Sequence, residues 1–221
     1  MIRVPDGKVT VNGKEYEIKS LFFSETEITW DVFDVYAFSK DLTDDQRAEG
    51  VDAKSRPSRP YGKYDRGFGH AGFPAIGMAF NSAEMFCAWL SKKTGKKYRL
   101  PNEAEWEYAA RAAVQIEPND LGKVAWFKDN AEGQTHEVGK KAPNAWGLYD
   151  VLGNASEWCV SLDTEQITRG GCYRDAKDAV NFSKRVPYSP DWQERDAQLP
   201  KSKWWLSDGG FVGLRVVCVA P

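Results

Sequence analysis

The stretch NAWGLYDVLGNASEW, residues 144–158, combines residue types that could do chemistry together. It is too polar for a buried strand and too rich in glycine for a helix, so a loop is expected. Asp150 and Glu157 can supply carboxylate oxygens, and the backbone at Gly153 and Ala155 can turn its carbonyls inward. Calcium prefers such a flexible shell of oxygen ligands. The residue types and their spacing therefore suit a calcium-binding loop.

A plain structural loop is the competing interpretation of the same residues. Trp146 and Trp158 would anchor the turn in the core, while Asp150 and Glu157 would stay in water. On spacing alone this is the more common outcome, because acidic side chains are mostly solvated.

Length and composition fit a folded domain with a sizeable core. The chain has 221 residues, of which 42% are hydrophobic, and nine tryptophans that could serve a core or a binding surface. The net charge is -2 and no basic stripe is visible, so nucleic acid is not an expected partner.

The apolar runs are far shorter than a membrane span. No basic segment followed by an apolar one is visible at the N-terminus, so no secretory signal is expected there, and a secreted or periplasmic origin stays open.

Helices must position this loop, and capping residues mark where they begin. Apolar periodicity predicts helices at 30–39, 81–94 and 102–113. Thr29 is a plausible N-cap for the first helix. Asn81 with Glu84, and Asn102 with Glu105, resemble capping boxes for the other two.

Strands are expected from short apolar or alternating runs, at 9–18 around an Asn12-Gly13 turn, 22–30, 157–162, 167–172 and 211–219. Pairing of 157–162 with 167–172 would make Cys159 and Cys172 diagonal neighbours, roughly 7–8 Å apart. That distance is too long for a relaxed disulfide. The polar segment 41–72 is expected to run over the surface. Without a visible repeat or linker, residues 1–221 are predicted to form one α+β domain.

Four blocks of the chain resemble, in order and spacing, one known family. They are YRLPNEAEWEYAARAA at 98–113, NAWGLYDVLGNASEW at 144–158, RGGCY at 169–173 and FVGLRVV at 211–217. Together they resemble the formylglycine-generating enzyme domain, also called the sulfatase-modifying factor domain. The resemblance implies a single irregular α+β domain related to the C-type lectin fold.

The resemblance also implies calcium. In this family the segment that matches the loop binds calcium, with two ligands acting through side chains and two through backbone carbonyls. The matching positions here are the four loop residues named above. A second calcium site of the family matches Asn130 and Ala131, although the stretch that follows them is shorter here.

The chain departs from the oxidases of this family where their chemistry occurs. Those enzymes use two cysteines to bind copper(I) as thiolates and to activate the oxygen that converts a substrate cysteine into formylglycine. The matching positions here are Asp175 and Val180, and neither can replace a thiolate. Ser156 stands where the family has an active-site aromatic. The resemblance therefore implies a member without copper-dependent oxidase activity.

The remaining cleft, expected to contain Ser156, Trp158, Cys172, Arg174 and Asp175, supports three hypotheses. The first is a calcium-stabilised binding or accessory protein that holds a peptide or a glycan there. The second is an oxidoreductase of altered chemistry, in which Arg174 lowers the pKa of Cys172 and makes it a nucleophile or redox group. An inert, half-buried Cys172 is the alternative to that role. The third is a plain structural module.

The other cysteines and the histidines give weaker signals. The resemblance places Cys87 and Cys218 in contact, either as a disulfide or as two packed thiols, depending on the compartment. The sequence contains only His70 and His136, which lie in unrelated segments. A non-haem iron site with two histidines and a carboxylate is therefore not expected.

Two polar segments could form binding surfaces. Trp192, Trp204 and Trp205 flank residues 189–207 and could contact a peptide or glycan, or could pin down an irregular loop. The segment 56–66 carries Arg56, Arg59, Tyr61, Tyr64 and Arg66 and could recognise a sulfate or phosphate group, or be a solvated loop.

Overall fold

Four strands begin the chain, most of the helices follow, and short strands make up most of the last third, an order typical of an α+β fold. The computed structural model describes residues 1–59, 62–112, 121–163 and 166–219. The strands are β1 Ile2–Val4, β2 Gly7–Val11, β3 Lys14–Ile18, β4 Leu21–Phe23, β5 Tyr98–Arg99, β6 Ser156–Val160, β7 Gln166–Arg169, β8 Arg185–Pro187, β9 Val212–Gly213 and β10 Val217–Val219. The helices are α1 Trp30–Ala37, α2 Asp44–Ala48, α3 Phe80–Thr94, α4 Glu103–Arg111 and α5 Leu121–Val124, with short 3₁₀ turns η1 Ala53–Ser55, η3 Lys177–Ala179 and η4 Pro190–Gln193. None of the described helices is long and apolar enough to cross a bilayer.

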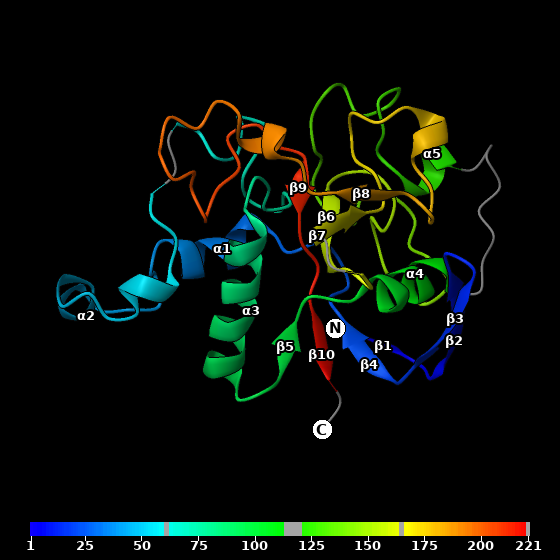
Figure 1. The fold of residues 1–221 in the computed structure, drawn as a ribbon, viewed down its shortest axis with the longest axis horizontal. Helices are drawn as coiled ribbons and strands as arrows, with labels where there is room; N and C mark the ends of the chain where they lie inside the picture. Colours follow the sequence, from blue (N-terminus) through cyan, green and yellow to red (C-terminus); the bar gives the residue numbers. More distant parts are fainter. Residues whose placement is uncertain (60–61, 113–120, 164–165, 220–221) are drawn as a thin grey trace.

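Within the described residues, the strands form two four-stranded sheets and one two-stranded ribbon. The four-stranded sheets have the orders β1-β4-β10-β5 and β8-β7-β6-β9. The ribbon pairs β2 with β3 around the Asn12-Gly13 turn, which confirms the first predicted hairpin. Figure 1 shows β9 and β10 in succession along the C-terminal stretch, so the end of the chain connects the two larger sheets.

The strand predicted at 211–219 is therefore two short strands. β9 pairs in parallel with β6, and β10 pairs with β4 and β5. Between them Arg215 is buried and donates to Glu157 instead of continuing either ladder. The strand predicted at 22–30 is also shorter, because β4 ends at Phe23. The residues after Phe23 make isolated backbone hydrogen bonds, rather than a ladder, to the chain around Arg215. One example is the bond from Ile28 N to Leu214 O at 2.9 Å.

The helix starts were predicted with mixed success. α4 has the complete capping box of Asn102 and Glu105, with both hydrogen bonds at 2.9 Å. Thr29 is at the N-cap of α1, but its side chain makes no capping bond. The prediction of a capping box at Asn81 and Glu84 was wrong, since α3 begins at Phe80 with Ala79 as its N-cap. A tertiary bond from Ala79 N to Trp204 O, 2.9 Å long, holds the chain extended just before that helix.

The second predicted hairpin forms between β6 and β7, but in another register. Cys159 is opposite Ile167, and β7 ends at Arg169. It ends there because Gly170 and Gly171 have left-handed φ angles of 88° and 73°, which a strand cannot contain. Cys172 therefore lies beyond the ladder, and the diagonal neighbourhood predicted for it and Cys159 was wrong. The residues 164–165 of the turn, and Ala113 at the predicted end of α4, lie outside the described residues.

Buried side chains form two clusters. One gathers the aromatic residues of α1 and α3, among them Trp30 and Phe86, and includes Cys172. The other packs Trp106 of α4 against β2 and β3 and includes Cys159 and Val180. The two thiols predicted to be neighbours thus belong to different parts of the core.

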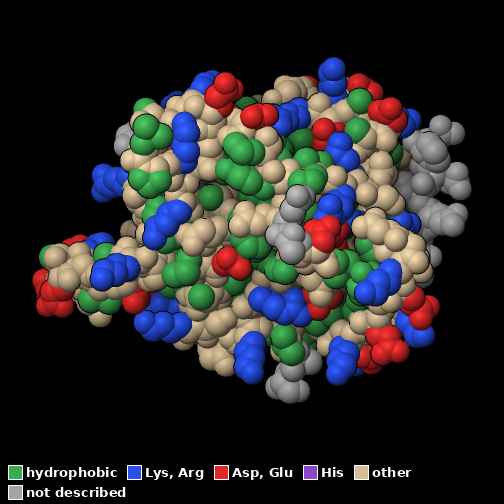
Figure 2. All heavy atoms as spheres, viewed as in Figure 1, with side chains coloured by type: hydrophobic (Ala, Val, Ile, Leu, Met, Phe, Trp, Pro, Cys, Tyr) green, Lys and Arg blue, Asp and Glu red, His purple; other side chains and the backbone are tan. Residues whose placement is uncertain are grey.

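The segment 41–72 follows the surface only in part. Figure 1 shows α2 projecting away from the body of the molecule. Arg56 is buried, however, and donates to both carboxylate oxygens of Asp41 at 2.8 and 3.0 Å. Tyr61 lies outside the described residues. Basic and acidic side chains are interspersed over the face seen in Figure 2, and no continuous basic stripe is visible on it.

Candidate functional site

The acidic residues of the predicted calcium loop are in the interior. Asp150 is 2% exposed and Glu157 1%, so the interpretation that left both in water was wrong. The loop turns through left-handed φ angles at Asp150, Gly153 and Asn154. Gly153 is required there, because a Cβ would lie 2.1 Å from the carbonyl oxygen of Trp126.

Glu157 is the counter-ion of Arg215. The guanidinium donates from Nε and Nη2 to the carboxylate at 2.9–3.1 Å, and the indole of Trp106 donates to Oε2 at 2.7 Å. Since these donors occupy both oxygens, Glu157 has little capacity left for direct metal binding.

Asp150 is different, because one of its oxygens has no partner. Oδ2 accepts the Gly139 N–H at 2.6 Å, whereas Oδ1 is buried without a hydrogen bond from any described residue. Burial raises the pKa of Asp150, and this effect outweighs the lowering by the Gly139 hydrogen bond and by the charges of Arg215 and Lys141. A buried unsatisfied oxygen is costly, and an unseen ion is one explanation for it.

Glu27 joins this group, although sequence reasoning missed it. Its oxygens accept the Ala155 N–H and the Asn154 side-chain amide, each at 2.8 Å. Burial, together with the charges of Asp150 and Glu157, raises the pKa of Glu27 well above its usual range. Arg215 is thus the cation beside three buried acids, so the interior here has an excess of negative charge.

This donor set fits calcium in part. No group of three or more Asp, Glu, His or Cys residues within the described ranges has the arrangement of a metal site. Asp150 Oδ1 has a vacant acceptor, and the other oxygens would come from the backbone carbonyls of Gly153 and Ala155. Glu27 and Glu157 would contribute charge rather than ligand atoms.

The second predicted calcium site has less support. Asn130 Oδ1 accepts the Phe127 N–H at 2.8 Å, closing a local turn. The carbonyl of Ala131 accepts from Gln134 N at 3.1 Å and is 3.0 Å from a ring nitrogen of His136. Because both expected ligands have partners inside the turn, this site stays a prediction.

The two histidines have separate surroundings. His136 stacks on Trp126, with ring centroids 3.8 Å apart. His70 lies 3.0 Å from Asp34 Oδ2 and stacks on Trp30. The two histidines therefore contact different residues in different segments of the chain.

The expected cleft is largely filled. Ser156, Trp158 and Cys172 are buried, and the indole of Trp158 donates to the Met78 carbonyl at 2.9 Å. Arg174 is exposed and packs over the ring of Phe211, 3.3 Å from its centroid. The surface end of the cleft therefore consists of Arg174 and the partly exposed Asp175.

Asp175 and Val180 lie together, as the resemblance implies for the two copper-binding positions. A Cβ at Gly171 would be 3.2 Å from Asp175 Oδ2 and 3.1 Å from Val180 Cγ2. Asp175 Oδ2 accepts the Cys172 N–H at 2.9 Å, and Val180 is buried in the core. At the two positions that the resemblance matches to the thiolate pair, the chain thus has a hydrogen-bonded carboxylate and a buried aliphatic side chain.

All four cysteines are buried free thiols. Burial, followed by the charge of Asp175, raises the pKa of Cys172 to about 12, so the thiol is protonated at neutral pH. This is opposite to the lowering that a nucleophile at Cys172 requires. Cys87 and Cys218 are not disulfide-bonded, and their contact stays a prediction.

The tryptophans of segment 189–207 hold the loop in place. Trp192, Trp204 and Trp205 are each 8% exposed, so most of each ring is buried in the protein and only a small part of it faces solvent. The indole of Trp205 donates to the Ser58 carbonyl at 2.7 Å and connects this segment to 56–66.

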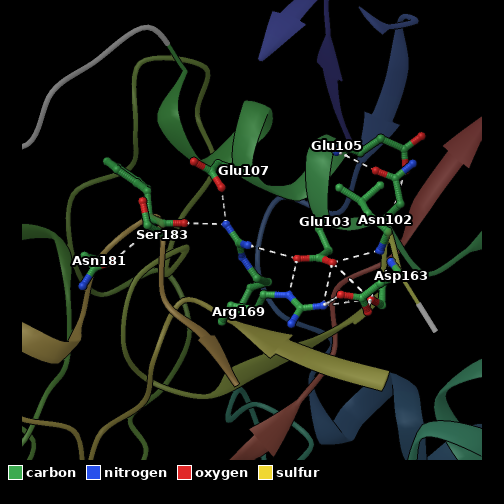
Figure 3. Close-up of polar contacts among 12 residues, drawn as sticks. Asn102, Glu103, Glu105, Glu107, Asp163, Arg169, Asn181 and Ser183 are labelled. Carbon is green, nitrogen blue, oxygen red and sulfur yellow. Dashed lines mark hydrogen bonds and ion pairs between the residues drawn. The ribbon is translucent and has the colours of Figure 1, made fainter. Parts of the chain in front are cut away.

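An ionic network that sequence reasoning did not find fastens β7 and β8 to α4. Figure 3 shows Glu103 and Glu107 of α4 facing Arg169 of β7. Arg185 of β8 donates to Glu103 at 2.9 Å and also pairs with Asp163. Glu103 and Arg169 are fully buried, which identifies the network as a structural connection behind the Gly170-Gly171 turn.

Comparison with known proteins gives the same family as the resemblance. A model of the sulfatase-modifying factor enzyme 1-like domain matches residues 1–198, which leaves the last block, FVGLRVV, outside the match. The inactive C-alpha-formylglycine-generating enzyme 2 of Bos taurus is 33% identical over 136 residues, which cover 52% of this chain and 43% of that protein. The formylglycine-generating enzyme of Mycobacterium tuberculosis is 32% identical over 116 residues, covering 45% and 37%. The serine/threonine-protein kinase pkn1 of Chlamydia pneumoniae is 28% identical over 149 residues, covering 55% and 22%. The matched regions thus span less than half the length of these relatives.

Solved structures share the fold along almost the whole chain. PvdO from Pseudomonas aeruginosa superposes with a TM-score of 0.69 at 23% identity, covering 99% of this chain and 93% of PvdO. Treponema denticola variable protein 1 gives a TM-score of 0.66 at 20% identity, covering 98% and 100%. At such identities the likeness concerns the fold alone. With the family match over residues 1–198, these findings show that the chain belongs to the sulfatase-modifying factor enzyme 1-like domain family.

Proposed function

We propose that this chain is a member of the family without copper-dependent cysteine oxidase activity, acting as a binding or accessory protein for a peptide or a glycan. The observation that carries the proposal is the pair Asp175 and Val180, both beside Gly171. A carboxylate is a hard ligand and an aliphatic chain is no ligand, whereas copper(I) requires soft donors such as thiolates. A relative named as an inactive formylglycine-generating enzyme is in keeping with this proposal.

Copper(I) binding tests the proposal. A competition titration with a copper(I) chelator should detect no tight site in the wild-type chain. The double variant Asp175→Cys/Val180→Cys, which restores both thiols, is expected to gain one. Tight copper(I) binding by the wild type would overturn the proposal, and melting curves of both proteins establish that each is folded.

The partner we propose would contact the surface end of the former cleft. Arg174 can donate hydrogen bonds from its guanidinium, and Asp175 has carboxylate oxygens beside it in the chain. Arrays of short peptides and of glycans should therefore give binding that Arg174→Ala weakens. Equal binding by wild type and variant would show that Arg174 is not part of the partner site.

We also propose that a calcium ion supports the loop. It would be held by Asp150 and by the carbonyls of Gly153 and Ala155, and it would compensate the negative charge of the buried acids. Bound calcium supplies a rigid cross-link between the turns of the loop. The unpartnered oxygen Asp150 Oδ1 supports this assignment.

The oxidoreductase alternative has weaker support. Cys172 is 1% exposed, and its raised pKa leaves almost no thiolate at neutral pH. Its sulfur is 3.5 Å from Asp175 Oδ2, and a neighbouring negative charge disfavours the thiolate further.

A further inference from the structure

A hollow of about 380 Å³ lies between residues 58–59 and 63–66 on one side and residues 195–207, far away in sequence, on the other. In Figure 1 the C-terminal segment is the orange loop beside the cyan stretch that follows α2. The bond from Trp205 to the Ser58 carbonyl holds the two segments together. None of the residues of the expected oxidase cleft lines this hollow. It is therefore a feature separate from the site described above.

The inner wall of the hollow is apolar. Ile76 and Leu206 are each 1% exposed, and Trp205 lies beside them. The ring of Tyr64 is half-buried and tilts against Trp205, with centroids 6.2 Å apart. Together they offer a surface suited to one face of a ring-sized group.

The rim is basic and partly preorganised. Arg66 donates from Nη2 to the Leu206 carbonyl at 2.9 Å. Its side chain lies flat against Gly210, where a Cβ would be 2.8 Å from Nε, so the absence of a side chain at Gly210 makes room for the guanidinium. Arg59 and Lys63 are exposed and line the same hollow. Three basic groups therefore border the apolar wall.

Among the residues that line the hollow, basic groups outnumber acidic ones. Arg195 also lines the hollow, but it pairs with Asp208. The carboxylate of Asp196 accepts the backbone N–H groups of Gln198 and Ser202 at 2.9 and 2.7 Å. The pair Arg195–Asp208 is neutral, so among the residues that line the hollow three basic groups, Arg59, Lys63 and Arg66, stand against one acid, Asp196. Asp34 and Asp65 lie close enough to act on Tyr64, but they are not part of the lining.

We propose that this hollow binds a small organic anion, whose sulfate, phosphate or carboxylate group meets Arg59, Lys63 and Arg66 and whose ring-sized body covers Tyr64 and Trp205. The volume falls within the range of small-molecule sites, roughly 300–1,000 Å³. Guanidinium groups suit planar or tetrahedral oxyanions, since they donate two parallel hydrogen bonds. The site uses neither the former thiol positions nor the calcium loop, so it does not depend on the function proposed above.

Calorimetric titration with aryl anions tests this inference. The probes are 4-nitrophenyl sulfate, 4-nitrophenyl phosphate and 4-nitrobenzoate, with 4-nitrobenzyl alcohol as the neutral analogue and inorganic sulfate as the anion without a ring. At least one aryl anion should bind at one site, roughly tenfold or more tightly than the neutral analogue, because charged hydrogen bonds are lost in the latter. The three anionic arms identify which oxyanion the site prefers.

Variants locate the binding. Arg59→Ala/Lys63→Ala removes two exposed side chains. It should lower the affinity for the preferred anion by roughly tenfold and leave the melting temperature unchanged. The matched control Lys19→Ala/Lys96→Ala removes two exposed lysines elsewhere and should bind as the wild type does. Arg66→Ala should also weaken binding. Equal affinity for the neutral analogue, wild-type affinity in the Arg59→Ala/Lys63→Ala variant, binding of inorganic sulfate alone, or no binding of any aryl anion would each overturn the proposal.

Discussion

The guanidinium of Arg215 lies 2.9 Å from the carboxylate of Glu157, and both side chains are 1% exposed. The pair joins the segment between β9 and β10 to β6. Arg215 Nη1 also donates to the carbonyls of Ser24 and Glu25, and Nη2 to that of Tyr149. One buried cation thus connects the C-terminal stretch, the N-terminal segment and the calcium loop.

Breaking this pair should be strongly destabilising. Glu157→Gln removes the charged acceptor of three hydrogen bonds from the buried guanidinium of Arg215, and a loss of about 3–5 kcal/mol in the free energy of unfolding is expected. Urea denaturation measures the loss. The exposed pair Lys8–Glu15 is the control, since Lys8→Ala should cost at most about 1 kcal/mol. Similar losses in the two variants would contradict the structural role of Arg215.

When calcium is chelated, the free energy of unfolding should fall as the pH rises, because the buried acids hold protons in the folded chain. Burial raises the pKa of Asp150 and of Glu27 above their ordinary values of 3.8 and 4.5. The folded chain therefore holds protons that the unfolded chain has released, so stability declines as pH rises above these ordinary values. Unfolding free energies measured along a pH series in chelator should show the decline, and the double variant Asp150→Asn/Glu27→Gln should flatten it. An equally steep decline in that variant would assign it to other groups.

Chelation of calcium should lower the melting temperature of the wild-type chain. A ligand bound only to the folded state stabilises by mass action, about 2.7 kcal/mol at a hundredfold excess over its dissociation constant. Asp150→Ala should remove the dependence on chelator, whereas Asp178→Ala, at an exposed aspartate, should retain it. A wild-type melting curve that ignores the chelator would show that Asp150 Oδ1 is not a calcium ligand.

Cys172 should react slowly with thiol reagents. Its pKa of about 12, raised by burial, leaves little thiolate, and its 1% exposure hinders access. Mass spectrometry of peptides after alkylation at neutral pH should find Cys172 unlabelled in the folded chain and labelled in denaturant. Fast labelling of the native protein would instead favour the oxidoreductase hypothesis.

Local signals in the sequence predicted local structure. The capping box of Asn102 and Glu105 lies within one turn and was confirmed, because neither residue needs a distant partner. The resemblance likewise led to the correct family, since its blocks lie in order along the chain. Asn81 failed as a cap because a tertiary bond from Ala79 to Trp204 decides where α3 begins.

Long-range partners could not be predicted from spacing. Glu27 is 128 residues from Ala155, whose N–H it accepts, and nothing in its own segment marks it as part of the acid cluster. The hairpin register failed because the left-handed turn at Gly170-Gly171 shortens β7. The competing interpretation left the acids of the loop in water, and only the structure shows Arg215 beside them.

The most direct test of the account concerns the reaction itself. The wild-type chain is incubated aerobically with copper and a peptide that carries the cysteine motif of a sulfatase, and mass spectrometry reads whether that cysteine becomes formylglycine. A formylglycine-generating enzyme serves as the positive control. With a carboxylate at 175 and a buried valine at 180, the account predicts no aldehyde above background. Copper-dependent aldehyde from the wild-type chain would contradict it.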